Sequence, residues 1–342
     1  MHGPALRQCR WLIVECDYTT GLGATMGVFA AFDDFQRTVD ADAEHVRAAR
    51  ERQRVFIDAI DSADAVVETV KSGSLARSTQ LDPIHDVDLI AVFDKATYPT
   101  WGQAGASAEE ALTVVHDLVR DTLANPGGSH DELVRLAVPK NRAVKCFVDE
   151  QDADHPFTVD VMPALRNEDG TLLIPSKRNA RWDTANPEYL IDEVQSRQNT
   201  WNQFRAMVRV LKYWRRDCGT EVKSLVMETL ALDYLPLETN RPNALRQFFV
   251  AAAYNVLEGV HDPAGLCGPI QPDLDVQALH EALSAASDEA TLAIEAAGRN
   301  DDASAQRHWQ KVFGEDFPAP IGGDSSSSVP PPSIKDAPQG AR

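Results

Sequence analysis

Three short segments of this chain carry residues that together suit phosphoryl transfer. A Gly73-Ser74 turn follows one apolar run, Asp86 and Asp88 open a second, and Asp160 stands between two valines in a third. Side chains alternate across a strand, so Asp86 and Asp88 are expected to point to the same face. Three converging carboxylates repel one another without cations, and an all-oxygen site suits Mg²⁺ or Mn²⁺ rather than Zn²⁺. The pattern predicts two bound metal ions and a turn that grips a triphosphate.

The turn has its own physical rationale. Gly73 lets the backbone approach a phosphate closely, and Ser74 is expected to begin a short helix whose free N–H groups favour anions. Taken singly, a Gly-Ser pair is usually only a turn, and an Asp-x-Asp pair is usually a solvated strand edge. Their order, their strand context and their intervals agree with one another, so the combination favours a catalytic site.

These segments also resemble a known family. The runs 73–79, 86–89 and 159–164 are similar to those of the DNA-polymerase-β-like nucleotidyltransferases, and within them to the bacterial cGAS/DncV-like nucleotidyltransferases (CD-NTases). The resemblance implies an ATP-binding or other nucleotide-binding enzyme of anti-phage (CBASS) defence. Such an enzyme joins nucleoside triphosphates into a cyclic di- or oligonucleotide, with release of pyrophosphate, for a downstream effector. The resemblance covers roughly residues 26–320. It also includes the segments 182–187, 211–214, 223–228 and 309–314.

The resemblance assigns further site residues. Lys212 matches the lysine that the family places on the donor triphosphate, and Ser224 matches a phosphate-contacting serine. The metal ligands would be Asp86, Asp88 and Asp160, with Asp160 also a candidate proton acceptor. Arg77, like Thr79, is left with two interpretations, because it could order the turn or reach phosphate. Arg205 and Arg216 share a helical face with Lys212 and are expected to form its solvated flank.

Two other groups of polar residues are interpreted as non-catalytic. His85 precedes Asp86 on the expected strand, so it should face away from the metals. Basic residues gather in two further segments but lack interleaved aromatic residues, so solvated loops are expected rather than a nucleic-acid surface. These basic residues are Lys140, Arg142, Lys145, Lys177, Arg178 and Arg181.

Composition narrows the class of protein. The chain has 342 residues, enough for two lobes, and its net charge of −19 argues against avid binding of duplex nucleic acid. Its 5 cysteines are odd in number and far apart, so no disulfide framework or zinc ribbon is expected. No apolar stretch is long enough for a transmembrane helix. These features indicate a cytoplasmic protein without membrane contact.

The expected architecture is α+β. Strands are expected near 65–70, 89–93, 144–148 and 157–162, after one long or two broken helices over 28–62. Beyond Asn186 only helices are expected, near 187–217, 222–235, 242–259, 276–298 and 302–312. We therefore predict a nucleotidyltransferase lobe with a mixed sheet and flanking helices over 26–180, a helical lobe over 181–320, and nucleotides in the cleft between them.

The two ends of the chain differ from the middle. Residues 1–25 form either an extension or a mis-called start, and no signal peptide is expected there. Residues 321–342 are rich in Ser, Pro and Gly and are expected to be a disordered tail. The family includes systems with ubiquitin-ligase-like partners that conjugate the C-terminus, so the tail is either a conjugation segment or a plain terminus.

Two alternative functions stay open. The same triad serves transferases that act on tRNA or on a protein acceptor, although the acidic charge weighs against tRNA. A catalytically inactive nucleotide-binding regulator is the non-enzyme alternative, but such a protein has no physical need for three converging carboxylates.

Overall fold

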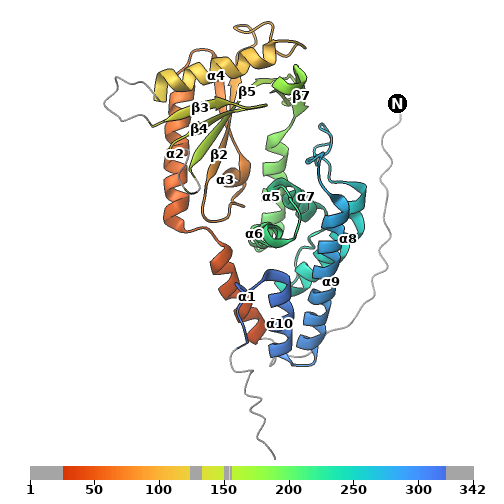
Figure 1. Cartoon of the computed structure of the whole chain (residues 1–342). Coiled ribbons are helices and arrows are strands. Elements are labelled where there is room, and N and C mark those ends of the chain that lie inside the picture. The colour runs from red at the N-terminus through yellow and green to blue at the C-terminus, as the bar shows by residue number, and fades with distance from the viewer. Residues whose placement is uncertain (1–25, 124–132, 150–153, 155, 321–342) are drawn as a thin grey trace, which may run out of the picture.

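The computed structural model of the chain describes residues 26–123, 133–149, 154 and 156–320. A mixed sheet with flanking helices occupies the upper half of Figure 1, and a group of helices lies below it. This arrangement confirms the predicted α+β class with an additional helical part. The expectations for residues 1–25 and 321–342 lie outside the described residues.

A seven-stranded sheet carries the three aspartates. Its main path is β1-β2-β5-β4-β3, and β6 pairs with both β5 and β7. The strands β2 and β5 run parallel, whereas the other described pairs are antiparallel. The strands are β1 (Val66–Ser72), β2 (Asp86–Phe93), β3 (Leu136–Pro139), β4 (Val144–Phe147), β5 (Thr158–Arg166), β6 (Leu172–Ser176) and β7 (Arg181–Ala185).

At the start of β2 and β5, alternation separates an apolar face from a polar one. Val87, Leu89, Val159 and Val161 are buried in one core. Two helices, α2 (Ala43–Asp61) and α4 (Ser107–Leu123), cover this core and contact strands of the sheet. Because neighbouring residues point to opposite faces, the aspartates project from the face that these helices leave open. Burial of one face therefore fixes the direction of the acidic residues on the other.

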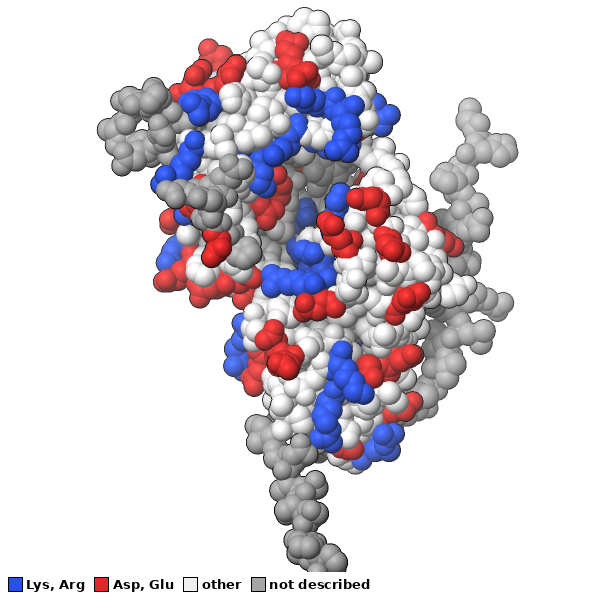
Figure 2. Space-filling view, in the orientation of Figure 1, with Lys and Arg blue, Asp and Glu red and all other residues white. Residues whose placement is uncertain are grey.

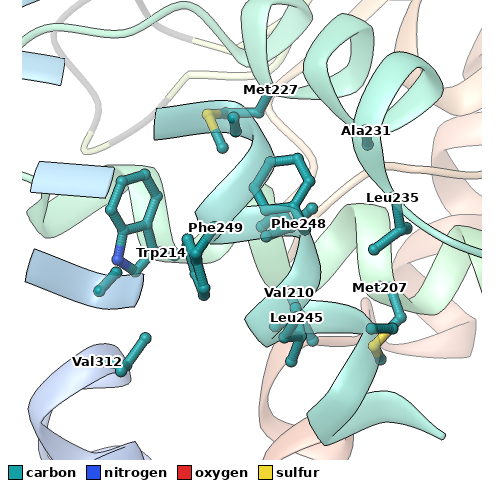
Figure 3. Close-up of a cluster of buried hydrophobic side chains, with 14 of the residues drawn as sticks. Met207, Val210, Trp214, Met227, Ala231, Leu235, Leu245, Phe248, Phe249 and Val312 are labelled. Carbon is teal, nitrogen blue, oxygen red and sulfur yellow. The ribbon is translucent and has the colours of Figure 1, made fainter. Parts of the chain in front are cut away.

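The helical part has its own apolar core, of which Figure 3 shows one cluster. Helix α1 packs into this core, with the Phe32 and Trp309 rings 5.1 Å apart in an edge-to-face contact. The bulky Phe248 and Phe249 are fully buried at its centre. The helices are α1 (Met26–Val39), α3 (Gly73–Arg77), α5 (Pro187–Thr200), α6 (Phe204–Trp214), α7 (Ser224–Tyr234), α8 (Arg241–Asn255), α9 (Val276–Gly298) and α10 (Asp302–Phe313), with short 3₁₀ turns η1 (Lys177–Asn179), η2 (Arg215–Asp217) and η3 (Val256–Glu258).

Several expected boundaries differ from the structure. The helix expected over 187–217 is two helices, because Trp201 adopts an extended backbone and buries its ring, ending α5 before α6 begins. The expected alternative of two helices over 28–62 is correct, since α1 and α2 are separate. Strands β3, β6 and β7 were not predicted individually. The first two are short and contain Pro139 and Pro175, which weaken a strand pattern.

The division into lobes at residue 180 stays a prediction. That residue falls between η1 and β7, and β7 pairs with β6 of the sheet. The N-terminal helix α1 packs with the C-terminal helices, so the chain passes more than once between the sheet and the helical part. Among the helices described, none combines the length and the apolar character needed to cross a membrane.

Candidate active site

Strands β2 and β5 bring the predicted aspartates together. Asp86 and Asp88 stand two residues apart on β2, and Asp88 is the direct register partner of Asp160 on the parallel strand β5. Ser72 of β1 pairs with Asp88 on its other side. A polar row therefore crosses the sheet on the face that the helices leave open.

The three carboxylates influence one another strongly. Burial, together with the negative charges of Asp86 and Asp160, raises the pKa of Asp88 to about 6. Burial also raises the pKa of Asp160, while Lys145 acts in the opposite direction. The buried Oδ1 atom of Asp160 has no hydrogen-bond partner among the described residues. Such a group of desolvated acids is stabilised by a bound cation.

The chemistry of these three side chains fits a hard divalent cation. Their donors are carboxylate oxygens from Asp86, Asp88 and Asp160, which Mg²⁺ and Mn²⁺ prefer. As the side chains stand, the described ranges contain no group of three His, Cys, Asp or Glu residues gathered closely enough to hold an ion. Ion binding would thus have to draw the carboxylates together, and the cation would remove the repulsion that raises the pKa of Asp88.

The turn after β1 is shaped around Asp88. Gly73 has φ +73°, a left-handed conformation that favours glycine. A Cβ atom at this position would stand 1.9 Å from Asp88 Oδ2. Only glycine therefore lets the turn and the acid occupy this space together, which explains the Gly-Ser pair physically.

A cavity of about 570 Å³ collects most of the predicted site residues. Figure 2 shows the hollow between the sheet and the helical part, with Lys and Arg side chains along its borders. Its remaining walls come from the start of α5 and from the loop between η3 and α9. Of the predicted residues, Gly73, Ser74, Arg77, Asp86, Asp88 and Ser224 line it.

A second cavity of about 240 Å³ adjoins the first through three shared residues, Ser74, Asp86 and Ser224. Lys212 lines this smaller cavity, and so does His85, which we expected to face away from the site. Asp160 is not among the residues that line either cavity.

Arg77 and Lys212 converge on one carboxylate. Arg77 Nε donates to Glu228 Oε2 at 2.6 Å, and Lys212 Nζ donates to Glu228 Oε1 at 2.8 Å. Lys212 Nζ also donates to the Thr79 carbonyl at 2.7 Å, and the Thr79 hydroxyl donates to Glu228 at 2.8 Å. Of the two interpretations of Arg77, this geometry supports the ordering of the turn. The predicted phosphate contacts of Arg77 and Lys212 stay predictions.

Glu228 is the residue that the sequence interpretation missed. Its side chain is 1% exposed, and although burial alone would raise its pKa, Arg77 and Lys212 lower it to about 2. The sequence did carry a signal, because a lone acid interrupts the apolar run of α7 and a buried charge needs partners. Its partner Arg77 lies 151 residues earlier, so the pairing itself could not be deduced.

Two of the basic residues expected in solvated loops lie on strands, Lys145 on β4 and Arg181 at the start of β7. The strand expected near 144–148 is confirmed, so the loop assignment of Lys145 is wrong. Lys145 is the register partner of Asp160, with Nζ 3.8 Å from Asp160 Oδ1. The other basic residues of these segments mostly have acidic partners. Arg142 and Arg181 pair with Asp183, and Lys177 pairs with Glu109.

Comparisons with known proteins agree with this geometry. Residues 26–198 match the family model for the Second Messenger Oligonucleotide or Dinucleotide Synthetase domain (SMODS). The chain is 22% identical to a probable cyclic nucleotide synthase of Bacillus cereus (strain VD146), over 85% of this chain and 97% of that protein. It is also 22% identical to a cyclic AMP-AMP-AMP synthase of an Acinetobacter species, over 77% of this chain and 76% of that protein.

A solved structure extends the likeness to the fold. The CdnC protein of E. coli MS115-1, solved with ATP, superposes with a TM-score of 0.67 at 19% identity, covering 85% of this chain and 98% of that one. The family match spans the sheet, both aspartate strands and the Gly-Ser turn. The chain belongs to the SMODS family, and it is a nucleotidyltransferase with the polymerase-β-like fold of the CD-NTases.

Proposed function

We propose that this enzyme joins nucleoside triphosphates into a cyclic di- or oligonucleotide and releases pyrophosphate, as a signal in anti-phage defence. The observation that carries the proposal is the pairing of Asp88 with Asp160 on parallel strands, beside the Gly73-Ser74 turn and a cavity of about 570 Å³. The two curated relatives, both cyclic nucleotide synthases, support the cyclic product.

The metal requirement is part of the proposal. The family generally uses divalent ions, and we assign two Mg²⁺ or Mn²⁺ ions to Asp86, Asp88 and Asp160. When bound, they would neutralise phosphate charge and lower the pKa of the attacking ribose hydroxyl. The protein's other contributions are positioning and charge neutralisation.

The donor triphosphate would lie against the turn. Gly73 lets the backbone approach the phosphates, and Ser74 and Ser224 border both cavities, where their hydroxyl groups can bind phosphate oxygens. An ammonium group has three N–H donors, and Lys212 uses two of them on Thr79 and Glu228. The third N–H is thus available to a phosphate in the smaller cavity.

The reaction is an in-line displacement. A ribose hydroxyl of the acceptor nucleotide attacks the α-phosphorus, a new O–P bond forms, and the bond to the β-phosphate oxygen breaks. The hydroxyl proton passes to Asp160, the candidate proton acceptor on β5. A second displacement within the linear product closes the ring.

The proposal also covers the domain organisation, the location and the partners of the enzyme. We assign residues 26–180 and 181–320 to two lobes around the site, and we place the enzyme in the cytoplasm. Its partners are nucleoside triphosphates and an effector that binds the cyclic product. A ubiquitin-ligase-like partner acting on the C-terminus is a further proposal.

Incubation of the purified protein with all four labelled nucleoside triphosphates and Mg²⁺ or Mn²⁺ tests the function. We expect a phosphatase-resistant product whose mass is that of a cyclic di- or oligonucleotide, and Asp88→Asn should not form it. Reactions with added tRNA test the alternative acceptor. Label found only on tRNA or on the protein would contradict a cyclic product and would favour a macromolecular acceptor. An absence of any transfer under all conditions would favour an inactive regulator.

A further inference from the structure

The smaller cavity is bordered by Lys212 and by two further basic residues that have no role in the proposed reaction. Lys212, at the end of α6, and Arg215 and Arg216 of the following turn η2 line one side of it. The acid among its lining residues is Asp86, a predicted metal ligand. In a chain with a net charge of −19, basic residues gathered around one small cavity indicate that an anion binds there.

Arg215 is the cation of this group that is half-buried and, among the described residues, forms no ion pair with a carboxylate. Its Nη1 donates to the Val222 carbonyl at 2.8 Å, but its buried Nε has no hydrogen-bond partner among the described residues. Burial and the adjacent Arg216 lower the pKa of Arg215, which means that its charge is incompletely compensated. A desolvated guanidinium with a free donor gains more from an anion than a solvated one does.

The neighbouring cations differ from Arg215, one in its carboxylate partner and the other in its exposure to solvent. Lys212 is already paired with Glu228. Arg216 is exposed, donates to the Asp82 carbonyl at 3.1 Å and lies over the Tyr213 ring. Arg216 therefore provides a matched control, since it lies in the same turn and lines the same cavity.

The location of the smaller cavity indicates which anion it would bind. The cavity shares Ser74, Asp86 and Ser224 with the larger one, so it lies beside the turn that is proposed to hold the donor triphosphate. We propose that Arg215 binds the β- and γ-phosphates of the donor nucleotide and holds the pyrophosphate leaving group. This inference rests on the proposed nucleotidyl transfer. As the bond to the bridging oxygen breaks, its electron pair stays on the β-phosphate, and the guanidinium stabilises that charge.

Binding of inorganic tripolyphosphate tests the inference without any turnover. Calorimetric titration in EDTA buffer compares the wild-type chain with Arg215→Gln and Arg216→Gln, after circular dichroism and melting curves have established folding. Loss of one charge-assisted contact should weaken binding by about tenfold in Arg215→Gln. Arg216→Gln should stay within about threefold of the wild type.

Arg215→Gln also removes the bond to Val222 and could unfold the turn. Arg215→Lys keeps the charge but replaces the planar guanidinium by a single ammonium group. It replaces the glutamine variant if that variant fails to fold, with Arg216→Lys as its control. Weaker binding in Arg215→Lys than in Arg216→Lys supports the inference.

Two results would overturn the inference. One is equal tripolyphosphate affinity in folded Arg215 and Arg216 variants, and the other is no measurable binding to the wild-type chain. Because the titration needs no product, a failure to make cyclic nucleotides would count against the proposed function alone.

Discussion

Arg77 and Glu228 form an ion pair, 2.6 Å from Nε to Oε2, that joins the end of the Gly-Ser turn to helix α7 of the helical part. The side chains are 8% and 1% exposed, so the pair is almost completely withdrawn from water. Lys212 of α6 shares the same carboxylate. The turn that is predicted to bind phosphate is thus held in place by residues of both parts of the molecule.

Removal of this carboxylate should disturb the site as well as the fold. Glu228→Ala leaves Arg77 and Lys212 buried without a counter-charge, so we expect a loss of about 3–5 kcal/mol in the free energy of unfolding. Glu228→Gln keeps the side-chain shape and should lose less. Urea unfolding measures the change, with the exposed Glu295→Gln on α9 as a control. Equal stability of Glu228→Ala and Glu295→Gln would contradict the assignment.

Substitution of the paired aspartates should abolish transfer without loss of the fold. Asp88→Asn or Asp160→Asn removes a predicted metal ligand, and we expect pyrophosphate release to fall by at least about 100-fold. Coupled detection of pyrophosphate measures the rate, and the exposed Asp192→Asn on α5 is the control. A rate for Asp88→Asn within tenfold of the wild type, as an order-of-magnitude limit, would refute the site.

The raised pKa of Asp88 predicts a pH dependence of stability in the absence of metal. Its folded-state pKa of about 6 lies above the ordinary aspartate value of 3.8. Ionisation therefore opposes folding, and this cost is absent below pH 3.8, grows as the pH rises and is complete above about 6. In EDTA, Asp88→Asn should raise the Tm more at about pH 8 than at about pH 5. A Tm difference independent of pH would show that Asp88 titrates normally.

The same pKa predicts that metal affinity falls in acid. A carboxylate must lose its proton to bind an ion, so Mn²⁺ affinity should weaken as the pH falls through about 6. Titration of Mn²⁺ followed by electron paramagnetic resonance measures this directly. Asp88→Asn should bind the ion weakly at every pH, and an unchanged affinity in that variant would exclude Asp88 as a ligand.

Gly73 and Gly170 form a matched pair for a test of the turn. Both have positive φ, +73° and +85°, but a Cβ atom at Gly73 would collide with Asp88 whereas one at Gly170 would meet no atom within 4 Å. Each alanine variant should lose roughly 1–2 kcal/mol through backbone strain. Gly73→Ala should in addition displace Asp88 and lose nearly all activity, while Gly170→Ala keeps it. Melting curves and pyrophosphate release distinguish the two effects, and an active Gly73→Ala enzyme would refute the close approach.

The sequence by itself determined the local features of this protein. Asp86 and Asp88 alternate with the apolar Val87 and Leu89, and that local pattern is typical of a strand with one buried face at this point. The Gly73-Ser74 turn and the apolar context of Asp160 are equally local. For the same reason the α+β class and most helices could be predicted, since periodicity and capping act over a few residues.

Tertiary structure decided which of the charged residues lie next to one another. The register that sets Asp88 opposite Asp160, and Lys145 opposite Asp160 in turn, depends on which strands become neighbours. The convergence of Arg77 and Lys212 on Glu228 depends on the packing of α6 and α7 against the turn. Such contacts join residues far apart in sequence, and the free energy that selects them comes from burial of whole faces rather than from local preference. A single sequence therefore specifies which residues carry the charges, and only the folded chain specifies which of them compensate one another.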